Sequence, residues 1–151
     1  MNEKELQVKA LKNGTVIDHI PSDKLFKVVS LLQLDSVKNQ ITIGNNLISK
    51  RMGIKGIIKI SERYYAEEEI SRIALIAPNA KINIIRDFEV IEKMVLSLPD
   101  RFCGIVKCPN PKCITNNEPM KTRFEVVSKD PIMLKCPYCE REIQQEDIQL
   151  L

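Results

Sequence analysis

The chain has 151 residues, of which 44% are hydrophobic, and a formal net charge of +3 at pH 7. This length suits one medium domain, or a small domain joined to a second one that a metal stabilises. Basic residues are scattered among acidic ones, which argues against a nucleic-acid partner, since such binding needs Lys and Arg gathered on one face. No apolar run is long enough to span a membrane and the charged first residues do not form a signal peptide, so we expect no membrane association.

The first two thirds of the sequence combine strand and helix patterns. Helical periodicity predicts helices at 23–34 and 66–77, with Ser22 as the N-cap of the first and Pro78 ending the second. Alternating apolar residues or β-branched runs predict strands at 6–10, 15–20, 40–44, 57–60 and 81–85.

A turn is predicted at 52–56, and the segment 88–96 has no single pattern. The resulting order, β-α-β-β-α-β, is that of a ferredoxin-like sandwich, with one extra strand at its front. In this α+β fold two helices cover one face of the sheet, and the other face stays open. An open face with apolar positions commonly binds another subunit or a ligand.

The last third of the sequence has few large apolar side chains, so we expect a metal to substitute for part of its core. The segment 97–100 is the predicted linker, and short strands are predicted at 102–107, 123–127 and 132–135. Two short hairpin turns can supply four thiolates to one tetrahedral zinc ion. Two close cysteine pairs have this spacing: Cys108 with Cys113, and Cys136 with Cys139. We therefore expect a small all-β zinc-ribbon (rubredoxin-like) domain with one structural zinc ion.

Two other chemistries stay open for these cysteines. The second pair, with its Pro-Tyr spacer, matches the redox motif of glutaredoxins, but it comes too late in the chain for a thioredoxin-like fold to follow it. Four thiolates also hold iron, although the wide first pair and the scarcity of glycine favour zinc. The fifth cysteine, Cys103, is expected to be a small buried residue. Reduced cysteines in metal spacing are typical of the cytoplasm, where we expect the protein to be.

The sequence offers no catalytic constellation. It has one histidine and contains no nucleophile elbow, phosphate-binding loop or dinucleotide fingerprint. Asp18, His19, Lys59 and Lys93 lie at or near predicted strands and, taken singly, are typical surface residues. Together they would bring two ammonium groups and an imidazole to one end of the sheet, which suits an anionic ligand such as a nucleoside triphosphate.

Several stretches resemble the regulatory chain of aspartate carbamoyltransferase, nearly from end to end and in order. The most specific is the octet GTVIDHIP at 14–21. The others include LQV at 6–8, ITIG at 41–44, IKI at 58–60, SLP at 97–99, CPN at 108–110 and LKC at 134–136. The resemblance implies a non-catalytic subunit of pyrimidine biosynthesis with two domains: a nucleotide-binding allosteric domain, 1–97, and a zinc domain, 102–151, that contacts the catalytic chain.

The same resemblance implies the partners and the site residues. In that family the regulatory chains pair into dimers that bridge two catalytic trimers, and CTP, UTP or ATP act as effectors. The implied nucleotide contacts are Val8, Leu11, Asp18, His19, Lys59, Asn83, Ile85, Phe88, Val90 and Lys93. The implied zinc ligands are Cys108, Cys113, Cys136 and Cys139. Two departures bear on nucleotide preference: Gly56 stands where an acidic residue is expected, and Phe88 lacks the hydroxyl of a tyrosine.

Two rival interpretations are open at this point. A zinc-ribbon nucleic-acid-binding protein would explain the four cysteines but not the N-terminal domain, and aromatic residues at 5% supply few stacking platforms. A nucleotide sensor without an enzyme partner would differ only in what co-purifies with it.

Overall fold

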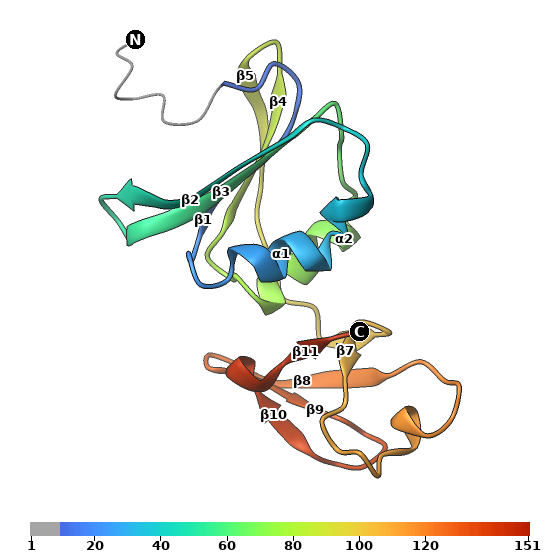
Figure 1. Ribbon diagram of the computed structural model, residues 1–151. Coiled ribbons are helices and arrows are strands. Elements are labelled where there is room, and N and C mark those ends of the chain that lie inside the picture. Colours follow the sequence, from blue (N-terminus) through green and yellow to red (C-terminus); the bar gives the residue numbers. More distant parts are fainter. Residues whose placement is uncertain (1–9) are drawn as a thin grey trace. The chain divides into compact units, whose positions relative to one another are not determined.

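The chain divides into two compact units, Met1–Ser97 and Leu98–Leu151. The structure, a computed structural model, describes residues 10–151 (Figure 1). The strand predicted at 6–10 therefore lies almost entirely outside the described residues, as does Val8. Among the described residues, no helix has both the length and the apolar character needed to cross a membrane.

The first unit is a five-stranded antiparallel sheet with two helices on one face (Figure 1). Its strands, in the spatial order β2-β3-β1-β4-β5, have these bounds along the chain: β1 Gly14–Ile20, β2 Ile41–Ser49, β3 Gly53–Ser61, β4 Lys81–Arg86 and β5 Glu89–Met94. Helix α1 (Leu25–Leu31) connects β1 to β2, and helix α2 (Glu67–Ser71) connects β3 to β4. Each connection therefore passes over one intervening strand, which is the split β-α-β arrangement of the predicted ferredoxin-like fold.

In this unit, β5 is the strand that the sequence pattern missed. It forms the edge of the sheet beside β4, and five of its six residues are exposed. Because neither face of this edge strand contributes to the core, no apolar alternation marks it in the sequence. The turn predicted at 52–56 was placed too late, since β3 already begins at Gly53.

Both helices are shorter than their periodicity predicts. Helix α1 begins after Lys24 rather than after Ser22, and no side chain caps it. The Lys24 N–H donates to the Pro21 carbonyl at 2.8 Å, so a turn after the proline takes the place of the cap. Gln33, with a φ of 52°, follows the helix and prevents its continuation to residue 34. The predicted acidic start of α2 is confirmed, and it then passes into a 3₁₀ turn at Arg72–Leu75.

The face of the sheet under the helices holds the core of the first unit. Ile17, Ile58 and Ile82 stand directly opposite one another on β1, β3 and β4, and each is at most 1% exposed. The other face carries a smaller apolar cluster of Val16, Ile57 and Ile85, against which Leu11 and Leu47 pack. The helices therefore bury one face of the sheet, and the side chains of this smaller cluster cover only part of the other face.

The second unit is built from short strands, as predicted. One sheet has the order β10-β9-β8-β6 and a second pairs β11 with β7, with these bounds: β6 Arg101–Cys103, β7 Val106–Lys107, β8 Arg123–Lys129, β9 Ile132–Lys135, β10 Glu142–Gln144 and β11 Gln149–Leu150. Phe124, Leu134 and Phe102 form its core, each at most 2% exposed.

Two predictions for this unit were wrong. The single strand expected at 102–107 is two strands, β6 and β7, because Gly104 has a φ of 69° and turns the chain between them. Cys103 is exposed rather than buried. Phe102 points into the core, so the alternation of side chains along β6 directs Cys103 to the opposite side.

Candidate functional site

The four paired cysteines meet in one cluster in the second unit. Their sulfur atoms all lie within 4.8 Å of one another, and three of the four residues are buried. The Sγ–Sγ distances are 3.6 Å between Cys108 and Cys139 and 3.7 Å between Cys113 and Cys136. Four sulfurs bound tetrahedrally at about 2.3 Å from one zinc ion would be about 3.8 Å apart. The arrangement therefore has the dimensions of a four-thiolate metal site.

The environment of these sulfurs also suits a cation. All four are free thiols, and burial raises the pKa of Cys108 to about 12 and also raises the pKa of Cys136. Burial also raises the pKa of Cys139. Hydrogen bonds with the Arg141 backbone and with the side chains of Asn110, Cys108 and Cys136 oppose this effect and lower the pKa to about 7. Buried thiolates need a positive partner, and a divalent metal ion supplies it.

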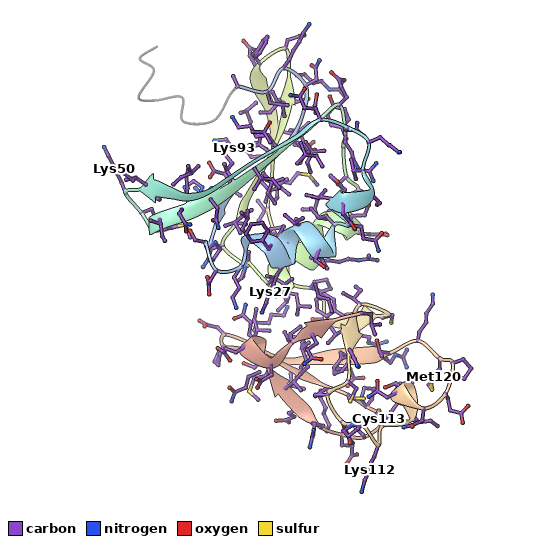
Figure 2. All side chains as sticks on the ribbon, in the orientation of Figure 1. Lys27, Lys50, Lys93, Lys112, Cys113 and Met120 are labelled. Atoms are coloured by element: carbon purple, nitrogen blue, oxygen red, sulfur yellow. The ribbon has the colours of Figure 1, made fainter. Side chains whose placement is uncertain are left out.

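The cysteine-bearing loops are held in place by their own hydrogen bonds. Cys113 lies in a surface loop beside the exposed Lys112 (Figure 2). In the second pair, the Cys136 N–H donates to the Arg141 carbonyl at 3.0 Å, and the Glu140 N–H donates to the Cys136 carbonyl at 2.7 Å. This compact turn returns the chain to Cys139, so that both sulfurs of the pair face the cluster.

A second candidate site lies on the open face of the sheet in the first unit. Strand pairing places Thr42, Lys59, Val16, Asn83 and Lys93 in one row across all five strands. Residues that stand opposite one another on antiparallel strands point to the same face. Three of the predicted nucleotide contacts therefore lie in one row, although they belong to different strands: Lys59 on β3, Asn83 on β4 and Lys93 on β5.

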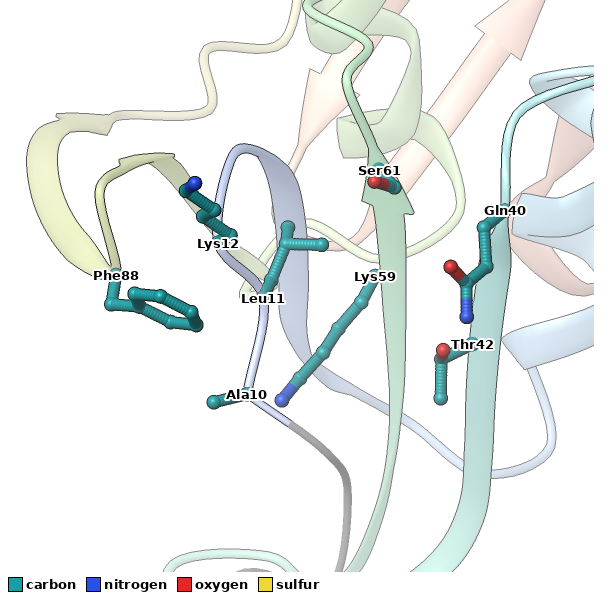
Figure 3. A pocket seen from close by; sticks show the side chains of 8 residues that line it. All are labelled: Ala10, Leu11, Lys12, Gln40, Thr42, Lys59, Ser61 and Phe88. Atoms are coloured by element: carbon teal, nitrogen blue, oxygen red, sulfur yellow. The ribbon is translucent and has the colours of Figure 1, made fainter.

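One pocket at this face has a volume of about 260 Å³. Its walls include Leu11 and Phe88, with Lys59 reaching along the sheet toward Ala10 (Figure 3). Gln40, Thr42 and Ser61 add amide and hydroxyl groups from the β2 and β3 side. The pocket therefore combines an aromatic ring, an aliphatic side chain and a cation, a mixture that suits a heterocyclic base and its sugar.

A second pocket, of about 370 Å³, lies at the other end of the same row, where Asn83, Lys93 and Lys81 line it. Of the remaining predicted contacts, Ile85 stands opposite Val90 and lies in the apolar cluster of the open face. Strand pairing thus places five of the predicted nucleotide contacts on this face of β3, β4 and β5: Lys59, Asn83, Ile85, Val90 and Lys93.

Asp18 and His19 lie at the end of β1 beside further cations. The Lys55 Nζ is 2.9 Å from the Asp18 Oδ1, and the His19 Nδ1 is 3.6 Å from the same oxygen. Burial lowers the pKa of His19; Asp18 opposes this, while Lys55, Lys81 and Arg51 lower the pKa further. Burial also lowers the pKa of Lys59, against an opposing influence of Asp18.

Sequence reasoning missed the cations Lys55, Lys81 and Arg51. Lys81 stands directly opposite Asp18 on β4, and Lys55 reaches the same carboxylate from β3. A signal for Lys55 was present, because it lies four residues before the predicted contact Lys59 on the same strand and therefore shares its face. Arg51 comes from the β2–β3 turn, which no periodicity places.

Gly56 was expected to bear on nucleotide preference, but it lies on the face covered by the helices. A Cβ atom at this position would be 2.9 Å from the Leu25 Cδ1 and 3.0 Å from the Asn45 Oδ1. The glycine therefore makes room for α1 and does not contact the open face.

Comparison with known proteins gives consistent results over both units. The family model for the allosteric domain of the aspartate carbamoyltransferase regulatory chain matches residues 6–97, and the model for its metal binding domain matches residues 100–149. Relatives named aspartate carbamoyltransferase regulatory chain include those of Phocaeicola vulgatus, 61% identical over 99% of this chain and 97% of the relative, and of Pyrococcus abyssi, 47% identical over 95% and 96%. Their names confirm the prediction of a regulatory rather than a catalytic subunit. This chain therefore belongs to the family of aspartate carbamoyltransferase regulatory chains.

Proposed function

We propose that this chain binds CTP, UTP or ATP on the open face of its first unit and thereby modulates the activity of an aspartate carbamoyltransferase catalytic chain. The observation that carries the proposal is the row of Lys59, Asn83 and Lys93, which strand pairing brings to one face between two pockets. Family membership supplies the regulatory role, and it favours this reading over a zinc-ribbon nucleic-acid-binding protein.

The two pockets suggest how the nucleotide is oriented. The apolar end at Leu11 and Phe88 suits the base, and Lys59 lies within reach of the base or ribose. The end at Lys93 and Lys81 offers two ammonium groups to the phosphates. Because these cations surround a concave, partly desolvated surface, they attract a triphosphate more strongly than the same charges would on an open surface.

The metal of the second unit is proposed to be zinc, held by Cys108, Cys113, Cys136 and Cys139. The sulfur spacing and the four thiol donors support it. With all positions filled by sulfur, the ion would stabilise the fold of this small unit and have no open position for catalysis. The folded unit would then present a surface that docks on the catalytic chain. No cysteine of the described chain forms a disulfide, which fits a reducing compartment, and we propose the cytoplasm.

Self-association of the first unit is supported by its edge strand β2. Among residues 10–151, this nine-residue strand pairs with a neighbouring strand on one side only, and Ile43 and Ile48 are 42% and 80% exposed. A long edge strand with exposed apolar side chains is a ready surface for pairing with a second copy. A dimer of this kind would link the catalytic subunits that each chain contacts.

Regulation of this kind requires no chemistry in the chain itself. An effector shifts the equilibrium between two quaternary states only by its differential affinity for them. A coupling free energy of about 1–3 kcal/mol would change substrate affinity roughly 5- to 150-fold.

Replacing Lys59 by Ala tests the nucleotide site. We expect calorimetric titration with CTP to show loss of binding, with the zinc content unchanged, because the change removes a cation from the row without touching the second unit. Lys27→Ala is the matched control, since Lys27 is an exposed lysine on α1, on the helix side of the sheet (Figure 2). Undiminished CTP affinity in the Lys59 variant would show that the site is assigned to the wrong face.

A further inference from the structure

We infer that the tripeptide Thr115–Asn117, which begins two residues after Cys113, positions the metal-binding loop and protects the sulfur of Cys113. This inference rests on the proposed metal site. It concerns three residues that neither the cysteine spacing nor the family description assigns to metal binding. Two sets of hydrogen bonds support it: those of the two asparagine amides and that of the threonine hydroxyl.

Asn116 holds the beginning of the loop. Its Nδ2 donates to the Cys108 carbonyl at 2.9 Å and to the Asn110 carbonyl at 2.8 Å. A side-chain amide has two N–H donors, so both are used on the backbone of the same loop. The two bonds fix the backbone at Cys108 and at Asn110 relative to Asn116, which lies eight positions after the first and six after the second.

Asn117 holds the rest of the loop in the same way. Its Nδ2 donates to the Pro111 carbonyl at 3.1 Å and to the Cys113 carbonyl at 2.8 Å. Together the two amides bond to four carbonyls between Cys108 and Cys113. The first pair has four spacer residues and the second pair two, so the first loop has more conformational freedom to lose on binding a metal. The asparagines remove that freedom in advance.

Thr115 acts on the sulfur itself. Its Oγ1 is 3.1 Å from the Cys113 Sγ, and the two residues are 8% and 2% exposed. A thiolate has no proton, so the hydroxyl must be the donor once Cys113 binds a metal. A hydrogen bond to a ligand sulfur draws electron density from it, and such outer contacts orient and tune metal ligands. Thr115 therefore makes this thiolate less nucleophilic than an unbonded one.

The test uses the full-length chain, loaded with Co²⁺, whose sulfur-to-metal charge-transfer absorption reports the electron density on the thiolates. Replacing Thr115 by Val removes the hydroxyl at nearly constant volume, and Thr115→Ser keeps it. We expect the Val variant to absorb at lower energy and to lose its metal to an organomercurial several-fold faster, with the Ser variant close to wild type. Identical spectra and release rates for wild type and the Val variant would overturn the role of Thr115.

The asparagines are tested by metal affinity in a competition titration with a chelating indicator. Asn116→Ala and Asn117→Ala are each expected to lower the affinity about 10- to 100-fold, the usual cost of losing an outer partner. Lys112→Gln is the control, because its exposed side chain belongs to the same loop and makes none of these bonds. If an Asn variant loses its fold, excess Co²⁺ should restore the tetrahedral spectrum at a higher metal concentration.

The possible outcomes distinguish a failure of this inference from a failure of the proposed four-cysteine metal site. Affinities equal to wild type in both Asn variants would refute the positioning role while leaving the four-cysteine site intact. A wild-type chain that binds neither Co²⁺ nor Zn²⁺ at one equivalent would refute both. Reduced affinity in the Asn variants, with the Lys112 variant unchanged, would support the inference.

Discussion

The protonation of His19 depends on its burial and on four charged neighbours. Its Nδ1 is buried without a hydrogen-bond partner in the described structure, and Asp18, Lys55, Lys81 and Arg51 all influence its charge. Burial and the three cations together outweigh the carboxylate and lower its pKa below the ordinary 6.5. The imidazole is therefore neutral near pH 7, and the anionic phosphates of a bound nucleotide would favour its protonated form.

The stability of the nucleotide-free chain should depend on pH through His19. Because its pKa is lower in the folded state, the unfolded state takes up the proton first as the pH falls. Its contribution to stability is thus complete above pH 6.5 and is lost as the pH falls through the folded pKa. Urea unfolding between pH 8 and pH 5 should show this loss in the wild type, and a smaller loss in His19→Gln. Equal pH dependence in the two proteins would contradict the assignment.

Gly56 gives a second test at the scale of one residue. Asp at this position would overpack against Leu25 and Asn45 and place a carboxylate under α1. Overpacking alone costs about 1–3 kcal/mol, and burial of the charge adds to it. We expect chemical denaturation to show this loss for Gly56→Asp and a smaller one for Gly56→Ala, with CTP affinity retained by the folded protein. A changed nucleotide preference with full stability would instead place this position in the nucleotide site.

Among the elements, the sheet has one face that packs against the helices and one that does not. Ile58 lies in the core under the helices, and its neighbour Lys59 points to the opposite face, where the nucleotide is proposed to bind. The register is set by the hydrophobic pattern, because a slip of one residue would exchange the two faces of a strand. Along this strand, one set of alternate residues therefore stabilises the core, and the other set faces the proposed nucleotide site.

Substitutions on the two faces should therefore have opposite consequences. Ile58→Ala should cost about 2–5 kcal/mol of unfolding free energy, the usual range for a buried isoleucine, and leave CTP affinity nearly unchanged. Lys93→Gln, at an exposed position of β5, should weaken CTP binding and leave stability within about 0.5 kcal/mol of wild type. Calorimetric titration and urea unfolding of both variants provide the check. Loss of both properties in either variant would argue against this division.

For the molecule as a whole, each unit has its own core, and the two differ in what holds them together. The first unit relies on buried isoleucine, leucine and valine side chains, whereas the second has a smaller core around Phe124 and the cysteine cluster. Small units with limited cores usually need such a metal to fold. A metal ion held by the four cysteines would therefore stabilise the second unit and not the first.

Stripping the metal with an organomercurial should separate the two functions. We expect the treated chain to lose its capacity to capture an aspartate carbamoyltransferase catalytic chain in a pull-down, because the second unit unfolds. CTP binding should persist, since the first unit contains none of the metal ligands. Adding thiol and Zn²⁺ should restore capture. Simultaneous loss of CTP binding would mean that the first unit does not fold independently of the second.

The sequence by itself determined the features that depend on near neighbours. Four cysteines at short spacings predicted their own cluster, and apolar periodicity predicted the order of helices and strands, because both signals lie within a few residues. The tertiary structure decided what depends on pairing between distant segments. It placed Lys59, Asn83 and Lys93 in one row, made β5 an exposed edge and turned Cys103 outward. Register and edge position arise from contacts between strands, and no local pattern encodes them.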